Sequence, residues 1–183
     1  MASADPPSTG PNVRDVTISV NGRVWKQGTD STAFTTPSSS KGRANIAIAR
    51  NGSTADASNG TGNRALATNH SSAFARDGDN NTATATNDGY AFAGVGDNNT
   101  ATATNGSFAF AQVGDDNTAT ATDNSSARAS DGNNNTATAT DNSWAVASDG
   151  DNNTATATCG GLATATGGQA VTDNGGFCKG LRV

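Results

Sequence analysis

The chain has 183 residues, enough for one domain or a small pair of domains. Ala, Thr, Asn and Gly supply 104 of them, whereas Leu, Ile, Val and Phe supply 21, which excludes an ordinary core of branched aliphatic side chains. No run of about 18 apolar residues could form a transmembrane helix, so no membrane partner is expected, and a net charge of −5 argues against nucleic acid as a partner. This composition is typical either of a disordered chain or of a fold with an unusual core.

The first residues carry no periodic pattern, and residues 1–12 are expected to form a disordered tail. Ala2-Ser3-Ala4 resembles the A-x-A end of a signal peptide, and a start of this style, common in exported actinobacterial proteins, implies secretion. Residues 13–45 are predicted to form an N-terminal capping segment. Its runs V-T-I-S-V and R-V-W-K flank Asn21-Gly22, a pair that is typical of a β-hairpin turn.

An 18-residue repeat dominates the middle of the chain. The string N-T-A-T-A-T recurs with this constant step at residues 81–86, 99–104, 117–122, 135–140 and 153–158. Looser copies start at Ile46 and Arg64, so about seven units fit between residues 46 and 171. Each unit contains two segments that alternate with period two, as β-strands do, separated by Asn, Asp and Gly of the kind found in turns. The sequence therefore predicts an all-β fold, a β-solenoid with 18-residue coils and two parallel β-sheets back to back.

Alanine occupies alternate positions of both strands in every unit. The positions between the alanines are threonine in one strand and varied residues, including Arg128, in the other. Because a buried arginine would be an uncompensated charge, we expect the alanines to face inward and to form a thin core of methyl groups. Columns of asparagine, such as Asn81 and Asn99, can add side-chain amide ladders along the stack.

Two cysteines, Cys159 and Cys178, lie near the C-terminus. They could close a loop of 20 residues, which in the chain-entropy model stabilises the fold by about 3 kcal/mol. Their spacing matches no zinc-binding pattern. We therefore expect a disulfide that fixes a C-terminal cap at residues 172–183, and with it a secreted or cell-surface location.

The T-A-T-A-T strands are predicted to present three columns of threonine to solvent. Strand geometry spaces neighbours about 6.7 Å apart along a strand and about 4.8 Å apart between coils. The opposite face carries Tyr90, Phe108, Arg128 and Trp144 at equivalent positions. Recent duplication combined with β-propensity would preserve both faces equally, whereas only the threonines are constant, so we interpret the threonine face as the working surface. Its members are Thr82, Thr84, Thr86, Thr100, Thr102, Thr104, Thr118, Thr120, Thr122, Thr136, Thr138, Thr140, Thr154, Thr156 and Thr158.

A flat grid of methyl and hydroxyl groups can order water, because methyl groups constrain neighbouring waters and hydroxyls anchor them by hydrogen bonds. Both spacings of the grid lie close to oxygen repeats on faces of hexagonal ice. Over Thr82–Thr158 the sequence resembles the T-x-T β-solenoid antifreeze proteins of insects and, more distantly, the repeats of bacterial ice-nucleation proteins. The resemblance concerns motif and architecture, since the 18-residue unit and the alanine core differ. It implies that the fifteen threonines bind ice and inhibit its growth.

A second interpretation is a secreted structural spacer or adhesin without ice activity. Stacked G-D-N-x-A repeats of this kind are similar to those in the head domains of surface adhesins. In that case the solenoid is a rigid rod, and its aromatic face is the contact surface. Thermal hysteresis separates the two hypotheses.

The varied face contains Tyr90, Phe92, Phe108, Phe110 and Trp144, which would form an exposed apolar patch. Such a patch normally marks an interface. We expect a second copy, forming a homodimer, or an N-terminal segment to cover it; the alternative is a ladder of tolerated surface aromatics.

The sequence favours neither a metal site nor an enzyme. Asp79, Asp97, Asp115 and Asp151 share a turn column, but the glycine pattern of calcium-binding solenoids is missing and Asn133 interrupts the column. The single histidine, His70, aligns with turn residues, so no nucleophile and base can be assembled. We expect no metal, no cofactor and no catalytic residue.

Overall fold

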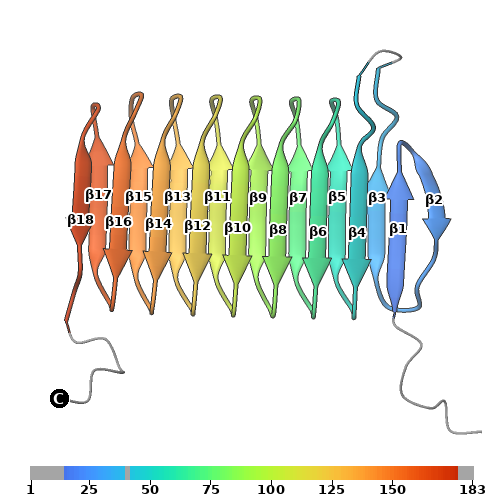
Figure 1. Ribbon diagram of the computed structural model, residues 1–183, viewed down its shortest axis with the longest axis horizontal. Helices are drawn as coiled ribbons and strands as arrows, with labels where there is room; N and C mark the ends of the chain where they lie inside the picture. Colours follow the sequence, from blue (N-terminus) through green and yellow to red (C-terminus); the bar gives the residue numbers. More distant parts are fainter. Residues whose placement is uncertain (1–14, 40–41, 177–183) are drawn as a thin grey trace, which may run out of the picture.

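A computed structural model describes residues 15–39 and 42–176, and the regular elements among them are all β-strands (Figure 1). Sheet A has ten strands in the order β18-β16-β14-β12-β10-β8-β6-β4-β1-β2, and sheet B has eight in the order β17-β15-β13-β11-β9-β7-β5-β3. From β2 onward the chain alternates between the two sheets. The predicted β-solenoid with two parallel sheets is therefore confirmed.

The strand bounds follow the repeat closely. Sheet A consists of β1 (Val16–Val20), β2 (Arg23–Lys26), β4 (Ile46–Arg50), β6 (Arg64–Thr68), β8 (Thr82–Thr86), β10 (Thr100–Thr104), β12 (Thr118–Thr122), β14 (Thr136–Thr140), β16 (Thr154–Thr158) and β18 (Ala170–Asp173). Sheet B consists of β3 (Thr32–Thr35), β5 (Thr54–Ser58), β7 (Ser72–Arg76), β9 (Tyr90–Gly94), β11 (Phe108–Gln112), β13 (Ser126–Ser130), β15 (Trp144–Ser148) and β17 (Leu162–Thr166).

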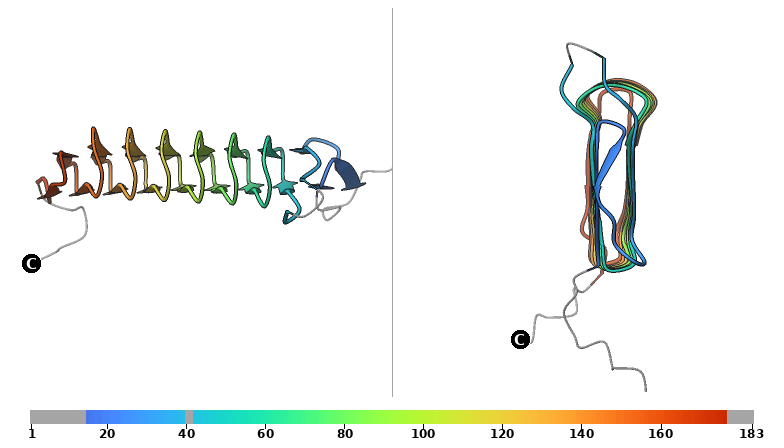
Figure 2. Two further views of the ribbon diagram at one scale, coloured as in Figure 1. Left: turned by 90° about the horizontal axis from the view of Figure 1, so that it is seen from above. Right: turned by 90° about the vertical axis from the view of Figure 1, so that its right-hand side faces the viewer.

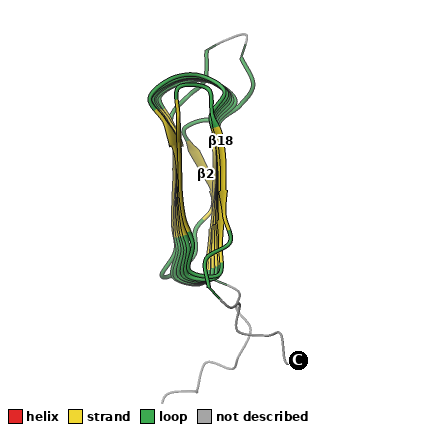
Figure 3. Cartoon of the chain, turned by 90° about the vertical axis from the view of Figure 1, so that its left-hand side faces the viewer, coloured by secondary structure: helices red, strands yellow, loops and turns green. Residues whose placement is uncertain are grey.

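Neighbouring coils stack in strict register with the predicted step of 18 residues, so that Thr102 pairs with Thr120. Seven coils begin at the even-numbered strands from β4 to β16, and β18 begins an eighth turn. The last coil is shorter, because Thr154 pairs with Ala170, and β18 runs two residues past the boundary expected at residue 171. Seen along the axis, the coils superpose, so both sheets are nearly flat (Figures 2 and 3).

Alanine fills the space between the sheets, as predicted. Two alanines of each T-A-T-A-T strand and two of each facing strand from β5 to β17 are buried, Ala83 and Ala91 completely. The small side chain lets the sheets approach closely, and the backbone ladders between coils satisfy the buried amide and carbonyl groups. The interior is not made of methyl groups alone, however, because rows of polar side chains border the alanines.

The asparagine that precedes each sheet A strand from β4 to β16 is buried inside the coil, not placed at a solvent-facing corner. Asn99 and its equivalents have no exposed surface. The Oδ1 atom of Asn99 accepts the backbone N–H of Asn117 at 3.0 Å, and its Nδ2 donates to the carbonyl of Gly114 at 2.8 Å. The ladder between amide side chains that the sequence predicts for this column is therefore not formed, because each amide bonds to backbone groups instead; bonds between amide side chains occur in another column, from Asn51 to Asn69 and Asn87.

A second inner row is built from serine at the opposite turn. The Oγ of Ser107 accepts the backbone N–H of Ser125 at 3.1 Å, and the Oγ of Ser125 accepts that of Ser143 at 3.1 Å. Gly89 interrupts the row; a β-carbon there would lie 2.6 Å from the carbonyl oxygen of Ala103. The two polar rows thus satisfy backbone donors where the strands end and the sheet ladders stop.

The predicted N-terminal hairpin is present. β1 and β2 pair in antiparallel fashion around Asn21 and Gly22, whose φ angles of 50° and 81° suit a tight hairpin turn. β1 also pairs antiparallel with β4, in the register Ile18 to Ile48, and so lengthens sheet A by two strands. In the view along the axis, β2 crosses between the two sheets at this end of the coil (Figure 2).

Several expectations fall on residues outside the described part of the chain. These are the tail at residues 1–12, most of the cap at residues 172–183, and Cys178. Cys159 follows β16 in the turn before β17, and its pairing with Cys178 stays a prediction. Among the described residues, no helix is long and apolar enough to cross a membrane.

Candidate functional site

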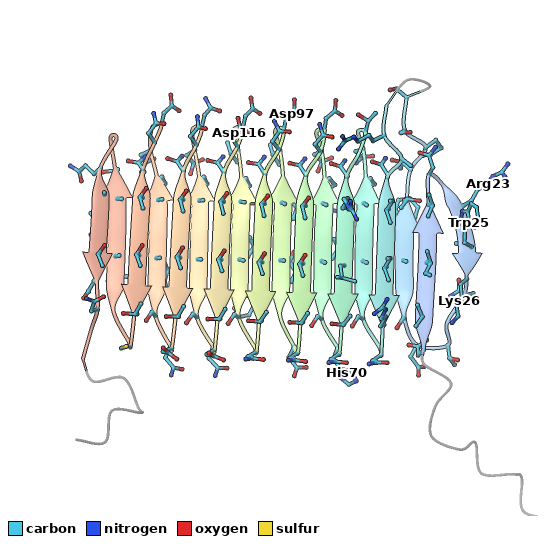
Figure 4. All side chains as sticks on the ribbon, in the orientation of Figure 1. Arg23, Trp25, Lys26, His70, Asp97 and Asp116 are labelled. Carbon is cyan, nitrogen blue, oxygen red and sulfur yellow. The ribbon has the colours of Figure 1, made fainter. Side chains whose placement is uncertain are left out.

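The fifteen predicted threonines form three straight columns on the outer face of sheet A, here called the threonine array. Five strands, β8 to β16, pair in parallel so that each threonine lies beside its equivalent in the next coil. Their side chains are half-buried between their neighbours, except the exposed Thr154. Side chains in equivalent positions form rows across the strands (Figure 4). The register thus brings together the complete set that the sequence predicts.

The hydroxyl groups of the array are turned to solvent. Within the described residues, only Thr158 of the fifteen has a side-chain hydrogen bond to another protein group, at 3.2 Å to Oδ1 of Asn174. The others must therefore bond to water, since a polar group without a partner costs free energy. The strands of the array contain only Thr and Ala, so the surface is uncharged as well as flat.

The array is longer than the perfect repeats. Thr68 of β6 pairs with Thr86, and Thr172 of β18 pairs with Thr156, so each extends one column. The repeat pattern predicts neither, because neither belongs to a T-A-T-A-T string: Thr68 ends R-A-L-A-T, and Thr172 follows the shortened last coil. The other neighbours of the array in β6 are Arg64 and Leu66, which end it on that side.

Acidic turn residues border the threonine array at one edge. The carboxylate of Asp97 accepts the backbone N–H of Asp79 at 2.7 Å, and that of Asp115 accepts the N–H of Asp97 at 2.8 Å. Asp97 and Asp116 mark this edge in Figure 4. Among the described residues, no group of three His, Cys, Asp or Glu side chains is placed to hold a metal ion. The Asp column therefore has a structural role, which is to cap the amide groups of the adjacent coil.

The opposite edge of the array carries a ladder of exposed amides. Asn51, Asn69 and Asn87 each donate from Nδ2 to the Oδ1 of the next residue in the column, at 2.7 to 3.0 Å. The column continues through Asn105 to Asp123, with an N···O distance of 2.6 Å. These residues take left-handed backbone conformations, as Asn87 does with a φ of 51°, which asparagine tolerates better than most residues.

The outer face of sheet B differs in kind. Tyr90 contacts Phe74, Phe108 and Phe110, with ring centroids 5.5, 6.3 and 5.6 Å apart. The guanidinium of Arg76 lies 5.3 Å from the ring centroid of Phe92. Four of the five predicted aromatics therefore belong to one cluster, which also includes Phe74.

The fifth predicted aromatic, Trp144 of β15, lies apart from this cluster. Ser126 stands between Trp144 and Phe108 in their shared column. The Trp144 side chain is 55% exposed. Phe74 was missing from the predicted patch because it occurs in the less regular coil that contains Arg64.

Comparison with protein-family models, with curated proteins and with solved structures finds no match for this chain. The fold and the two faces define a β-solenoid with one uniform and one varied surface.

Proposed function

We propose that the protein binds ice through the threonine array and inhibits the growth of the crystal. The observation that supports this proposal is the register of β8 to β16, which places fifteen threonines in a flat, uncharged lattice with solvent-facing hydroxyls. Strand geometry sets the spacings of this lattice at about 6.7 and 4.8 Å. No pocket, charge or catalytic group is needed for such an activity.

The proposed mechanism begins with water on the array. Waters that lie between methyl groups of neighbouring coils are constrained by the apolar surface. Hydroxyls hold the same waters by hydrogen bonds and fix their positions relative to the protein. The ordered layer then merges with the crystal lattice, and growth stops where the protein is adsorbed.

The decisive experiment is thermal hysteresis of the wild-type protein and of Thr120→Lys. Thr120 lies in the middle column of the middle strand, β12, so a long cation there interrupts the lattice at its centre. We expect hysteresis to be lost, whereas the free energy of unfolding falls by no more than about 1 kcal/mol, because the half-buried side chain lies on the outer face and Lys favours strands less than Thr does.

A matched control comes from the opposite face. Thr164 is an exposed, outward-facing threonine of β17 in sheet B, and Thr164→Lys makes the same chemical change away from the array. It should keep full hysteresis. Wild-type protein without hysteresis would overturn the proposed function, and a fully active Thr120→Lys protein would overturn the site.

We propose further that the fold is closed at both ends and works outside the cell. The β1–β2 hairpin would cover one end of the coil, and the part of the expected cap (172–183) that follows β18 would cover the other, fixed by a disulfide between Cys159 and Cys178. The expected secreted or cell-surface location provides the oxidising conditions for that bond. Mass spectrometry of the unreduced, protease-digested protein tests the pairing.

A rigid cell-surface spacer or adhesin is the second candidate. The exposed side chains of Phe108, Trp144 and Leu162 on sheet B favour it, because a rod with a contact face needs such a surface. A spacer or adhesin would show no hysteresis, and its activity would be insensitive to Thr120→Lys.

A further inference from the structure

The central column of sheet B has a symmetric order of side chains. From β3 to β15 it contains, in order, Phe34, Asp56, Phe74, Phe92, Phe110, Arg128 and Val146, and Thr164 of β17 follows outside this symmetric series. Phe92 is the midpoint of this series. An aromatic ring lies one coil away on each side, opposite charges lie two coils away, and apolar side chains lie three coils away.

This order makes the face complementary to itself. A two-fold axis that lies between two facing copies, along the strand direction and over β9, would bring each coil opposite its mirror position in the partner. Phe92 would then meet Phe92, Phe74 would meet Phe110, and Asp56 would meet Arg128. We propose that the protein forms a homodimer through the outer faces of sheet B, with this arrangement.

The dimensions of the face suit a stable dimer. Seven strands, β3 to β15, spaced about 4.8 Å apart and about five residues long, overlap in this arrangement and cover about 34 by 16 Å, or about 540 Å² in each copy. A pair would bury about 1,100 Å², which is just above the roughly 1,000 Å² that a specific protein interface needs. Because both sheets are nearly flat (Figure 2), the seven overlapping strands can make contact at once.

The charges at the rim have partial partners within one copy. The Asp56 side chain is 17% exposed; its carboxylate lies 3.7 Å from the guanidinium of Arg76, and its Oδ1 atom is buried without a hydrogen-bond partner among the described residues. Arg128 is 3.1 Å from Asp131, at a site where the arginine side chain is 47% exposed. In the proposed dimer Asp56 and Arg128 face each other twice, once at each end of the aromatic cluster.

Two valines in the turns after β9 and β11 add exposed apolar surface to the coils that carry the aromatic cluster. Val95 and Val113 follow β9 and β11 with φ angles of 57° and 56°, a left-handed conformation that disfavours β-branched side chains. The described coils with β5, β7, β13 and β15 have Asn or Asp at this position, at residues 59, 77, 131 and 149. The valines are 48% and 42% exposed, so packing within one copy does not explain them, and the left-handed backbone does not favour them.

A second copy fits this face better than the start of the chain does. Residues 1–14 contain only Met1 and Val13 as large apolar residues. They could therefore contribute little apolar surface over the aromatic rings. A second copy supplies matching rings and charges.

Sedimentation equilibrium of Asp56→Arg, of Arg128→Asp and of their equimolar mixture tests the arrangement. Wild-type protein should be dimeric at micromolar concentration. In each variant alone, like charges oppose each other twice, so self-association should weaken at least tenfold. In the mixture both contacts regain opposite charges, and a heterodimer should form with near wild-type affinity. Circular dichroism checks that each variant is folded.

The controls separate this proposal from ice binding. Thr120→Lys changes only the far face and should remain a dimer, and both charge variants should keep hysteresis. A wild-type protein that stays monomeric at 100-fold higher concentration would overturn the dimer. Failure of the mixed variants to associate, although wild type dimerises and both variants are folded, would overturn this arrangement.

Discussion

The two outer faces of the solenoid share the same backbone architecture and differ in the side chains that they expose. Both sheets have parallel five-residue strands that turn two alanines inward. Outside, sheet A repeats threonine, whereas the equivalent positions of sheet B include Tyr90, Phe110, Arg128 and Trp144. Because the backbone accepts all of these residues, the constancy of threonine is not a requirement of the fold.

The faces also differ in where their side chains find partners. On sheet B, aromatic rings contact one another, Arg76 pairs with Asp56, and Arg128 pairs with Asp131. On the threonine array, the hydroxyls face water instead of other protein groups. Among the described residues, the one exception is Thr158, whose hydroxyl bonds to Asn174. One face is therefore organised by contacts within the protein, and the other by its contact with solvent. This difference supports assigning different tasks to them.

Both faces depend equally on the stacking of the coils, so a substitution that disrupts the stacking should abolish both the threonine array and the aromatic face. Gly114 has a φ of 134°, and a β-carbon there would lie 2.0 Å from the carbonyl oxygen of Gly132 in the next coil. We expect Gly114→Ala to lower the free energy of unfolding by more than about 5 kcal/mol. Chemical denaturation followed by circular dichroism measures this effect.

Gly150 provides the control for that substitution. It belongs to the same column, with a φ of 129°, but a β-carbon there would lie 3.6 Å from its nearest neighbour, the backbone of Gly167. Gly150→Ala keeps the backbone strain and lacks the clash, so it should cost about 1–2 kcal/mol. Equal losses in the two variants would show that contact between coils at this column contributes nothing.

The inner asparagine row is the next test of the shared scaffold. Asn117→Ala removes the acceptor for the N–H of Asn135 and the donor to the carbonyl of Gly132, both inside the coil. Two unsatisfied groups should lower the free energy of unfolding by about 2–5 kcal/mol. Asn105→Gly, in the exposed ladder, should cost less than about 1 kcal/mol. Thermal melts of the two variants give the comparison directly.

The alternation of residues was enough to predict the strands, their facing and the threonine columns. The same pattern did not predict that the inner asparagines are buried, because Asn beside Gly and Asp is usual in exposed turns. Only stacking between coils provides the hydrogen bonds that a buried amide needs. The sequence nevertheless contains a signal that these asparagines have a structural role. Asn45 and Asn63 keep the asparagine in coils that have lost T-A-T-A-T, so this residue is more constant than the threonines.

Other features depended on contacts distant in sequence. Nothing in Val16–Val20 specifies an antiparallel pairing with Ile46–Arg50, because both segments are simply β-rich. The shortened last coil follows from the replacement of a five-residue turn by Gly167, Gly168 and Gln169, and it placed Thr172 in register with the array. Such registers are set by turn length and packing, which local patterns do not encode.

The smallest expected effect concerns pH and the hairpin end of the scaffold. The pKa of Asp15 is lowered to about 2, first by the hydrogen bond from Ser31 and further by the backbone N–H groups of Gly52, Asp30 and Thr29. Since the ordinary value is 3.8, the ionised carboxylate stabilises the fold fully above about pH 4. This stabilisation is lost as the pH falls toward about 2.

Asp15→Asn should therefore melt at a lower temperature than wild type at pH 7, and the difference should close between about pH 4 and pH 2. Asp88→Asn is the control, because the Asp88 carboxylate makes no hydrogen bond or ion pair among the described residues. The strands of the threonine array contain no titratable group, so hysteresis should stay constant wherever the protein is folded. A hysteresis that falls with pH before the fold melts would mean that charged groups outside the array take part in binding ice.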